Sequence, residues 1–221
     1  MLHQPIVAVE PAPLPRIAGG ALATAFALRA ASMQFDRNAE IYGEDEPAEY
    51  FYEVVTGAVR TYKVLADGRR QIGAFHLPGD IFGLEAGIAH GFSAEAVVDS
   101  VVRVAKRSSI VALAARDPNV AADLWAATAR GLRGAQEHML LLGRKNAEER
   151  VASFLLAMAG AAGGEIIELP MSRQDIADYL GLTIETVSRT LTHLEAKSAI
   201  ELPSSRRIVV KSRASLQRLD A

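Results

Sequence analysis

The chain of 221 residues contains no cysteine. This absence excludes disulfide bonds, thiolate zinc sites and cysteine-ligated iron–sulfur clusters, and it suits a reducing compartment. A cupin-type metalloenzyme would need clustered histidine ligands on adjacent strands. We therefore expect no metal, no cofactor and no enzymatic activity, because the five histidines are scattered singly as His3, His76, His90, His138 and His193.

Long hydrophobic runs are also missing. The apolar run at 17–28 is too short to span a bilayer, and residues 1–15 lack the basic start of a signal peptide. We therefore expect no membrane association and a cytoplasmic location. Residues 1–18 are interpreted as a flexible arm that contains several prolines.

The net charge is only −2, so overall charge points to no partner. The distribution is more informative, because residues 1–143 hold 13 Lys and Arg against 16 Asp and Glu, whereas residues 185–221 hold seven against four. A mildly acidic body with a basic end is compatible with a local nucleic-acid footprint, but ordinary surface scatter fits equally well.

Short apolar runs alternate with turn signals between residues 35 and 112. Asp67-Gly68 is a hairpin signal between two strand-like runs, and Pro78-Gly79-Asp80 marks another turn. Residues 96–113 supply two more strand-like pieces. Strands at this spacing predict an antiparallel sandwich or barrel, and we assign a β-barrel to residues 19–116.

The hydrophobic period then changes to that of a helix. A 4-3 spacing between Asp117 and Gly143 gives a heptad seam with one polar member. We interpret residues 117–143 as a dimerisation helix, since one small domain has little need of so long a helix. A buried intramolecular helix is the alternative. The seam consists of Ala121, Trp125, Thr128, Leu132, Ala135, Met139 and Leu142.

Two helices joined by a tight turn are predicted over residues 172–196, within a C-terminal domain at 144–221. Ser172 can cap the first helix with Asp175 in a near capping box, Gly181 can end it, and Thr183 can cap the second. The pattern fits a helix-turn-helix, although many helical hairpins share it.

The exposed face of the second helix carries Glu185, Ser188 and Arg189 near its N-terminal end. In a recognition helix this end meets base edges in the major groove. Arginine can donate two hydrogen bonds to guanine, glutamate can accept one from cytosine, and serine is a short adaptable donor. A Glu–Arg pair that merely stabilises a solvated helix is the alternative.

Downstream, residues 199–216 are typical of strand, polar turn, strand and short helix, with Ser204 and Ser205 at the tip. Such a wing beside a helix-turn-helix would place basic groups near phosphates, although these groups could simply be solvated. The residues that we expect to contact phosphate are Ser172, Arg173, Gln174, Thr183, Thr186, Arg206, Arg207 and Lys211.

From about residue 35 onward the chain resembles the CRP/FNR family of transcription regulators, and within it the FixK-like subgroup. The resemblance covers residues 54–83, the join at 142–156 and, most specifically, GLTIETVSR at 181–189. The cyclic-AMP type has glycine in place of Ser188 and arginine in place of Ile184, so Glu185-x-x-Ser188-Arg189 matches the FNR type. The resemblance implies that these residues, Ile184 included, read a TTGAT-like half-site of an inverted repeat.

The same resemblance implies an α+β fold with a jelly-roll, cyclic-nucleotide-binding-like domain, a long dimerisation helix and a winged helix-turn-helix. It also implies a homodimer on double-stranded DNA and an activator that contacts RNA polymerase.

The chain departs from the family at the sensor. FNR-type oxygen sensors hold an iron–sulfur cluster on N-terminal cysteines, and this chain has no cysteine. Phe92-Ser93 stands where cyclic-AMP receptors have Arg-Ser, and the loss of this arginine removes the charge that would neutralise a cyclic phosphate. Glu85 lies near the place of the family's ribose-binding glutamate. We therefore expect a degenerate pocket and no small-molecule effector. A pocket for another small molecule, lined by Ser93 and Glu85, or haem bound through His76 or His90, remains the alternative.

Overall fold

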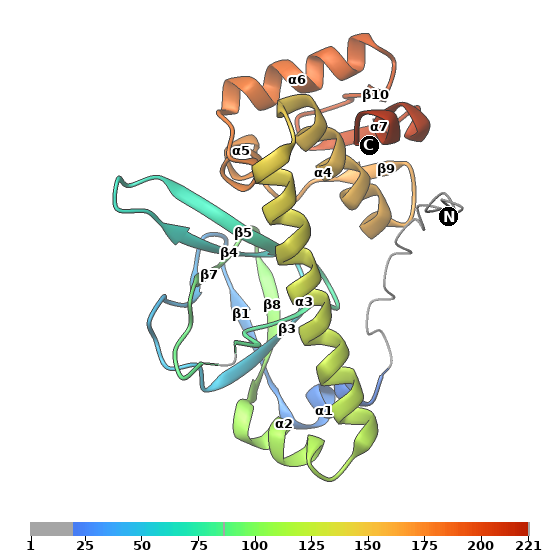
Figure 1. Ribbon diagram of the computed structural model, residues 1–221. Helices are drawn as coiled ribbons and strands as arrows, with labels where there is room; N and C mark the ends of the chain where they lie inside the picture. Colours follow the sequence, from blue (N-terminus) through green and yellow to red (C-terminus); the bar gives the residue numbers. More distant parts are fainter. Residues whose placement is uncertain (1–19, 86, 221) are drawn as a thin grey trace, which may run out of the picture.

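The computed structural model describes residues 20–85 and 87–220, so the arm expected at residues 1–18 lies outside the described residues. A long helix runs beside an N-terminal domain of two β-sheets and ends in a smaller, mainly helical C-terminal domain (Figure 1). The sequence predicts this order of β domain, long helix and helix-turn-helix domain. The N-terminal domain also contains two helices that the sequence analysis does not predict.

The N-terminal strands form two antiparallel sheets of four strands, in the orders β1-β8-β3-β6 and β2-β7-β4-β5. The antiparallel prediction is confirmed, but the described strands close no barrel. The outer strands are β1 and β6 in one sheet and β2 and β5 in the other, and among the described strands no pairing joins the two sheets. The strands are β1 (Ala31–Phe35), β2 (Glu40–Tyr42), β3 (Tyr50–Thr56), β4 (Val59–Val64), β5 (Arg70–His76), β6 (Ile81–Phe82), β7 (Ser93–Ala96) and β8 (Ser100–Lys106).

Helix α1 (Ala21–Arg29) contains most of the apolar run that is too short for a membrane span. It buries Leu22 and Phe26 completely against the β domain and the long helix. The backbone N–H of Leu22 also donates to the carboxylate of Asp123, at 3.0 Å. The run therefore belongs to the hydrophobic core.

Helix α2 (Arg107–Ala114) replaces the end of a segment that we predicted as a strand, so that part of the prediction was wrong. Strand β8 ends where the Arg107 guanidinium donates to the carbonyls of Ala48 and Gly87, at 3.2 and 2.9 Å. Only Ile110 of this short helix is fully buried, so its sequence shows no helical period.

Helix α3 (Pro118–Arg144) lies within one residue of the predicted bounds. The Asp117 side chain caps it by accepting from the backbone N–H of Asn119, and Pro118 occupies its first turn, where proline costs no hydrogen bond.

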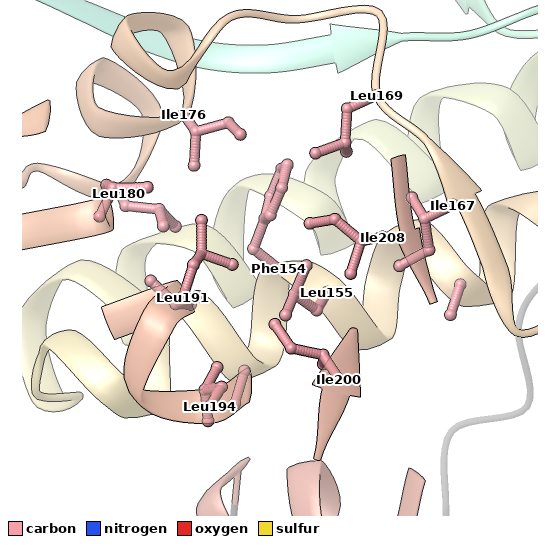
Figure 2. Packing of buried hydrophobic residues seen from close by; sticks show 14 of the residues in the cluster. Phe154, Leu155, Ile167, Leu169, Ile176, Leu180, Leu191, Leu194, Ile200 and Ile208 are labelled. Atoms are coloured by element: carbon pink, nitrogen blue, oxygen red, sulfur yellow. The ribbon is translucent and has the colours of Figure 1, made fainter. Parts of the chain in front are cut away.

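The C-terminal domain has its own core, built from helices that cover a small sheet in the order β10-β11-β9 (Figure 2). Its predicted helices, strands and final short helix are confirmed. The elements are α4 (Ala147–Ala162), β9 (Ile166–Glu168), α5 (Arg173–Leu180), α6 (Ile184–Ala196), β10 (Ile200–Glu201), β11 (Arg207–Val210) and α7 (Arg213–Asp220).

This C-terminal core continues into the N-terminal domain. Ala58 and Val97 are buried in the same cluster. The ring of Phe75 in β5 lies 5.3 Å from the Tyr179 ring and 6.5 Å from the Phe154 ring, measured between centroids. The two domains therefore share an apolar contact at β5.

His76, at the end of β5, should make stability depend on pH. Its ring stacks on Phe82 with centroids 4.9 Å apart, and burial lowers its pKa from 6.5 to about 4. The unfolded chain then binds the proton more readily than the folded one, so the free energy of unfolding falls as the pH drops from about 6.5 to about 4.

Replacing His76 with leucine should flatten this dependence. When the pH falls from 7 to 4.5, the free energy of unfolding of His76→Leu should fall by about 2 kcal/mol less than that of the wild type, as measured by urea unfolding. This figure is below what the full pKa shift implies, because the ring keeps some solvent contact. His193→Gln is the matched control, since that side chain is 56% exposed. Equal losses in His76→Leu and the wild type would contradict the assignment.

Candidate nucleic-acid interface

Helix α5 begins with the capping box that the sequence predicts. The Ser172 hydroxyl accepts from the backbone N–H of Asp175 at 3.1 Å, and the Asp175 carboxylate accepts from the backbone N–H of Ser172 at 3.0 Å. The helix ends at Gly181, whose φ of 61° and ψ of 41° are left-handed. A Cβ there would lie 3.2 Å from Leu142, so glycine suits both the backbone and the space.

Helix α6 follows after the turn, capped by Thr183, whose hydroxyl accepts from the backbone N–H of Thr186 at 3.2 Å. Val187, Leu191 and Leu194 are buried in the C-terminal core, as predicted. The two helices thus form a capped helix-turn-helix, with α6 at the end of the molecule that lies away from the two N-terminal β-sheets (Figure 1).

The structure leaves Glu185, Ser188 and Arg189 together on the exposed side of α6, and Ile184 is 37% exposed beside them. The pKa of Glu185 lies below its ordinary value. The causes are hydrogen bonding to its own backbone and to Thr183, and the charge of Arg189. At neutral pH the face therefore presents one anion, one hydroxyl and one cation, as a surface that reads base edges requires.

The phosphate-contact candidates on α5 and in the turn lie at helix N-termini, where backbone N–H groups also attract anions. Gln174 is exposed, and its amide donates to Asp178 at 2.6 Å. Arg173 is half-buried, burial lowers its pKa, and its buried Nη1 has no hydrogen-bond partner among the described residues. The contacts of Ser172, Thr183 and Thr186 are those of the two helix caps.

The basic residues of the wing each have a partner within the chain. Arg206 donates to the carbonyl of Pro170 at 2.8 Å, so its guanidinium helps to hold the wing. Arg207 lies 3.3 Å from Glu168, and Lys211 lies 2.5 Å from Glu201. Both ion pairs are about half exposed and contribute little to stability, so these two cations could exchange a carboxylate for a phosphate.

The heptad seam of α3 is mostly uncovered. Trp125, Leu132 and Met139 are 76%, 61% and 65% exposed, and Ala121, Thr128 and Ala135 are exposed as well. Leu142 differs from the other six, because it is half-buried and packs within its own chain beside the turn between α5 and α6.

The three residues of the expected degenerate pocket do not converge on one space. Ser93 accepts from the backbone N–H of Glu44 at 2.9 Å, and the Phe92 ring lies over Gly73. Glu85 instead approaches His90, with Oε2 3.3 Å from Nδ1.

Aromatic rings fill the region between the sheets. Tyr42 stacks on His90 with centroids 3.6 Å apart and lies 5.0 Å from Tyr52, which stacks on Phe82 at 5.1 Å. Packing of this kind occupies space that a ligand between the sheets would need.

The sequence analysis did not identify Arg60, Arg70 and Gln71 as functional residues. All three reach α5 from strands β4 and β5. Asp175, the partner of Arg60 and Arg70, appeared only as a capping residue. Contacts between residues more than a hundred positions apart leave no local pattern that a single sequence could reveal.

Neither a metal site nor a membrane span emerges from residues 20–85 and 87–220. These residues contain no group of three or more histidine or carboxylate side chains that could hold a metal ion. No helix among them is long and apolar enough to cross a bilayer.

Comparisons with known proteins agree with this architecture. A model of the Crp-like helix-turn-helix domain matches residues 149–219, and one of the cyclic nucleotide-binding domain matches residues 32–117. The chain is 55% identical over 193 residues to the nitrogen fixation regulation protein FixK of Azorhizobium caulinodans, covering 85% of this chain and 78% of that protein. It is 44% identical over 165 residues to the transcriptional activatory protein AadR of Rhodopseudomonas palustris, covering 72% and 69%.

A solved structure shows the same fold. That of FixK2 from Bradyrhizobium japonicum matches with a TM-score of 0.84 at 57% sequence identity, covering 87% of this chain and 98% of that one. With these matches spread over both domains, the chain belongs to the CRP/FNR family, and it is a FixK-like DNA-binding transcription regulator and not an enzyme.

Proposed function

We propose that the protein binds a TTGAT-type inverted repeat in double-stranded DNA as a homodimer. The observation that supports this most directly is the reading face of α6, where Glu185, Ser188 and Arg189 are exposed at the capped N-terminal end. In a helix-turn-helix this end enters the major groove, and two-fold symmetry would set two such helices about 34 Å apart.

The exposed seam of α3 supports dimerisation. Large apolar side chains such as Trp125, Leu132 and Met139 are costly to leave in water, and a second copy of the same helix would cover them in a two-stranded coil. The dimer would place both DNA-binding domains at the same end of the paired helices, as an inverted repeat requires.

We further propose that DNA binding needs no small-molecule effector. The aromatic packing of Tyr42, Tyr52 and Phe82 between the sheets supports this, as does Phe92 in place of a phosphate-binding arginine. Direct tests are binding of the purified protein, without additives, to a TTGAT-type repeat and to a scrambled one.

Activation through contact with RNA polymerase, in the cytoplasm, completes the proposal. It is supported by the relatives described above, one of which is named a transcriptional activatory protein. Transcription from a promoter that carries the repeat, with and without the protein, tests this part separately.

Arg189→Ala should weaken binding to the repeat by about 1–3 kcal/mol per half-site, because it removes the bidentate contact with guanine. It should also relax the preference for guanine at that position. Fluorescence anisotropy against the repeat and its single-base variants measures both effects.

Arg207→Ala is the matched control for this experiment. A phosphate contact carries no base information, so this variant should weaken all sequences alike and lower the salt dependence. An Arg189→Ala variant that keeps its affinity and its base preference would refute the contact assignment.

Trp125→Glu or Leu132→Glu should break the dimer, because each would place a charge in the apolar seam, and tight DNA binding should be lost with it. Analytical ultracentrifugation measures the oligomeric state. Gln136→Glu adds the same charge to the same helix at an exposed position outside the seam and should leave the dimer intact. Intact dimers of the seam variants would rule out the proposed interface.

A second candidate function is a sensor for a small polar molecule between the sheets. It is favoured by the Tyr42 hydroxyl and His90 Nε2, two buried polar atoms that have no hydrogen-bond partner among the described residues. Glu85 Oε2 and His90 Nδ1 are also buried, and they face only each other, at 3.3 Å. Calorimetric titration with cyclic nucleotides, haem and common metabolites tests it. We expect no heat of binding, and a saturable signal that His90→Phe abolishes would establish the sensor.

A further inference from the structure

We propose that Arg70 is a positioning residue for DNA recognition, because it ties the first helix of the helix-turn-helix to the β4–β5 hairpin and so fixes where the reading helix points. The inference rests on the proposed DNA-binding function. It concerns a set of contacts that we call the α5 clamp, made by Arg60, Arg70, Gln71, His138 and Arg150.

The charged side of the clamp lies on the flank of α5 that faces the sheet. Arg70 donates from Nε to Asp178 at 2.8 Å and from Nη2 to Asp175 at 2.7 Å. Arg60 donates from Nη1 to the same oxygen of Asp175 at 3.0 Å. Arg60 and Asp175 are each only 5% exposed, so this is a buried network.

The far end of α5 is held through its last carbonyl groups, which have no partners within the helix. Gln71 donates to the carbonyls of Asp178 and Tyr179, at 2.8 and 3.2 Å. His138 of α3 bonds to the Tyr179 carbonyl at 2.7 Å, and Arg150 of α4 donates to the Leu180 carbonyl at 2.8 Å.

An apolar contact lies under these polar ones. The rings of His138 and Tyr179 stack with centroids 4.1 Å apart and planes 4° from parallel, and Phe75 approaches Tyr179 from β5. Burial lowers the pKa of His138. The ring is therefore neutral at physiological pH and can donate to a carbonyl.

The clamp matters for DNA because the proposed dimer joins through α3, whereas the bases are read by α6. The distance between the two reading helices of a dimer is fixed by the contacts of the DNA-binding domain with the rest of the chain, and the polar contacts of α5 are part of them. Buried ion pairs add little net stability. We infer that this network instead defines the orientation of α5. Fixing the orientation in advance lowers the entropy lost when both half-sites are engaged.

The clamp also neutralises acids close to the DNA-facing end of α5. Burial by itself raises the pKa of Asp175, but the Ser172 hydrogen bonds and the charges of Arg60 and Arg70 outweigh it and hold the pKa below its ordinary value. Asp175 is therefore an anion whose charge is compensated within the protein, beside residues that we expect to approach phosphates.

The test compares Arg70→Met with Arg69→Met in the full-length protein. Both variants remove one positive charge from the same hairpin, but the side chain of Arg69 is 77% exposed, and its ion pair among the described residues is with nearby Asp67. The DNA probes are an inverted repeat with the native spacing, the same repeat with two base pairs inserted, and a single half-site, all measured by fluorescence anisotropy.

The wild type and Arg69→Met should prefer the native spacing. For Arg70→Met, the affinity for the native repeat divided by the affinity for the lengthened repeat should be lower than in the wild type by about fivefold or more. Fivefold is the lower end of the usual range for coupling between two sites. Binding to the single half-site should change by less than about twofold, because the reading face is untouched. Arg70→Lys, which keeps the charge but loses the fork, should lie between the two.

A second measurement needs no DNA. Hydrogen exchange of the α5 amides should be faster in Arg70→Met than in Arg69→Met. If Arg70→Met does not fold, Arg70→Lys takes its place in both measurements.

The outcomes separate the two proposals. If the wild type shows no preference for the repeat, the proposed function fails. Hydrogen exchange of the α5 amides is then the remaining test of the α5 clamp. An Arg70→Met variant with an unchanged spacing ratio and unchanged exchange overturns the positioning role. Tighter binding by Arg70→Met also overturns it, since the clamp would then be inhibitory.

Discussion

The placement of α5 against the N-terminal domain centres on one buried carboxylate, that of Asp175. It completes the cap of α5 with Ser172, and it is the meeting point of Arg60 and Arg70 from the N-terminal sheet. An uncompensated charge at this depth would be costly, so the cap, the two arginines and the packing of the domains must form together. The first helix of the helix-turn-helix is thereby part of both domains.

This constraint explains the different roles of the two domains. The β domain keeps the fold of a cyclic nucleotide-binding domain, yet aromatic side chains pack between its sheets, and its β4–β5 hairpin carries arginines that face α5. The contacts of the hairpin therefore give the β domain a structural role toward the DNA-binding domain. In this view the hairpin and the long helix act together as a frame for the DNA-binding domain.

Much of the C-terminal architecture was predictable because its determinants are local. Ser172, Gly181 and Thr183 form the caps and the turn that their residue types favour, and Val187, Leu191 and Leu194 are buried at helical spacing. Helix α2 was predicted wrongly as a strand, because eight residues with a single buried side chain show no period. Two open sheets stand in place of the predicted barrel, because the spacing of strands and turns along the chain does not say which strands pair with each other.

The sequence by itself determined the helix-turn-helix with its caps and buried stripe, since these depend on residues spaced within a few turns of chain, and through its resemblance to known regulators it indicated the family. Only the tertiary structure decided what holds the reading face in place. Arg70 and Asp178 are far apart in sequence. The residues next to an arginine in a hairpin do not indicate which distant carboxylate it will pair with. Long-range charge pairing depends on how the domains dock, and that docking is set by the shared core around Phe75 and Tyr179.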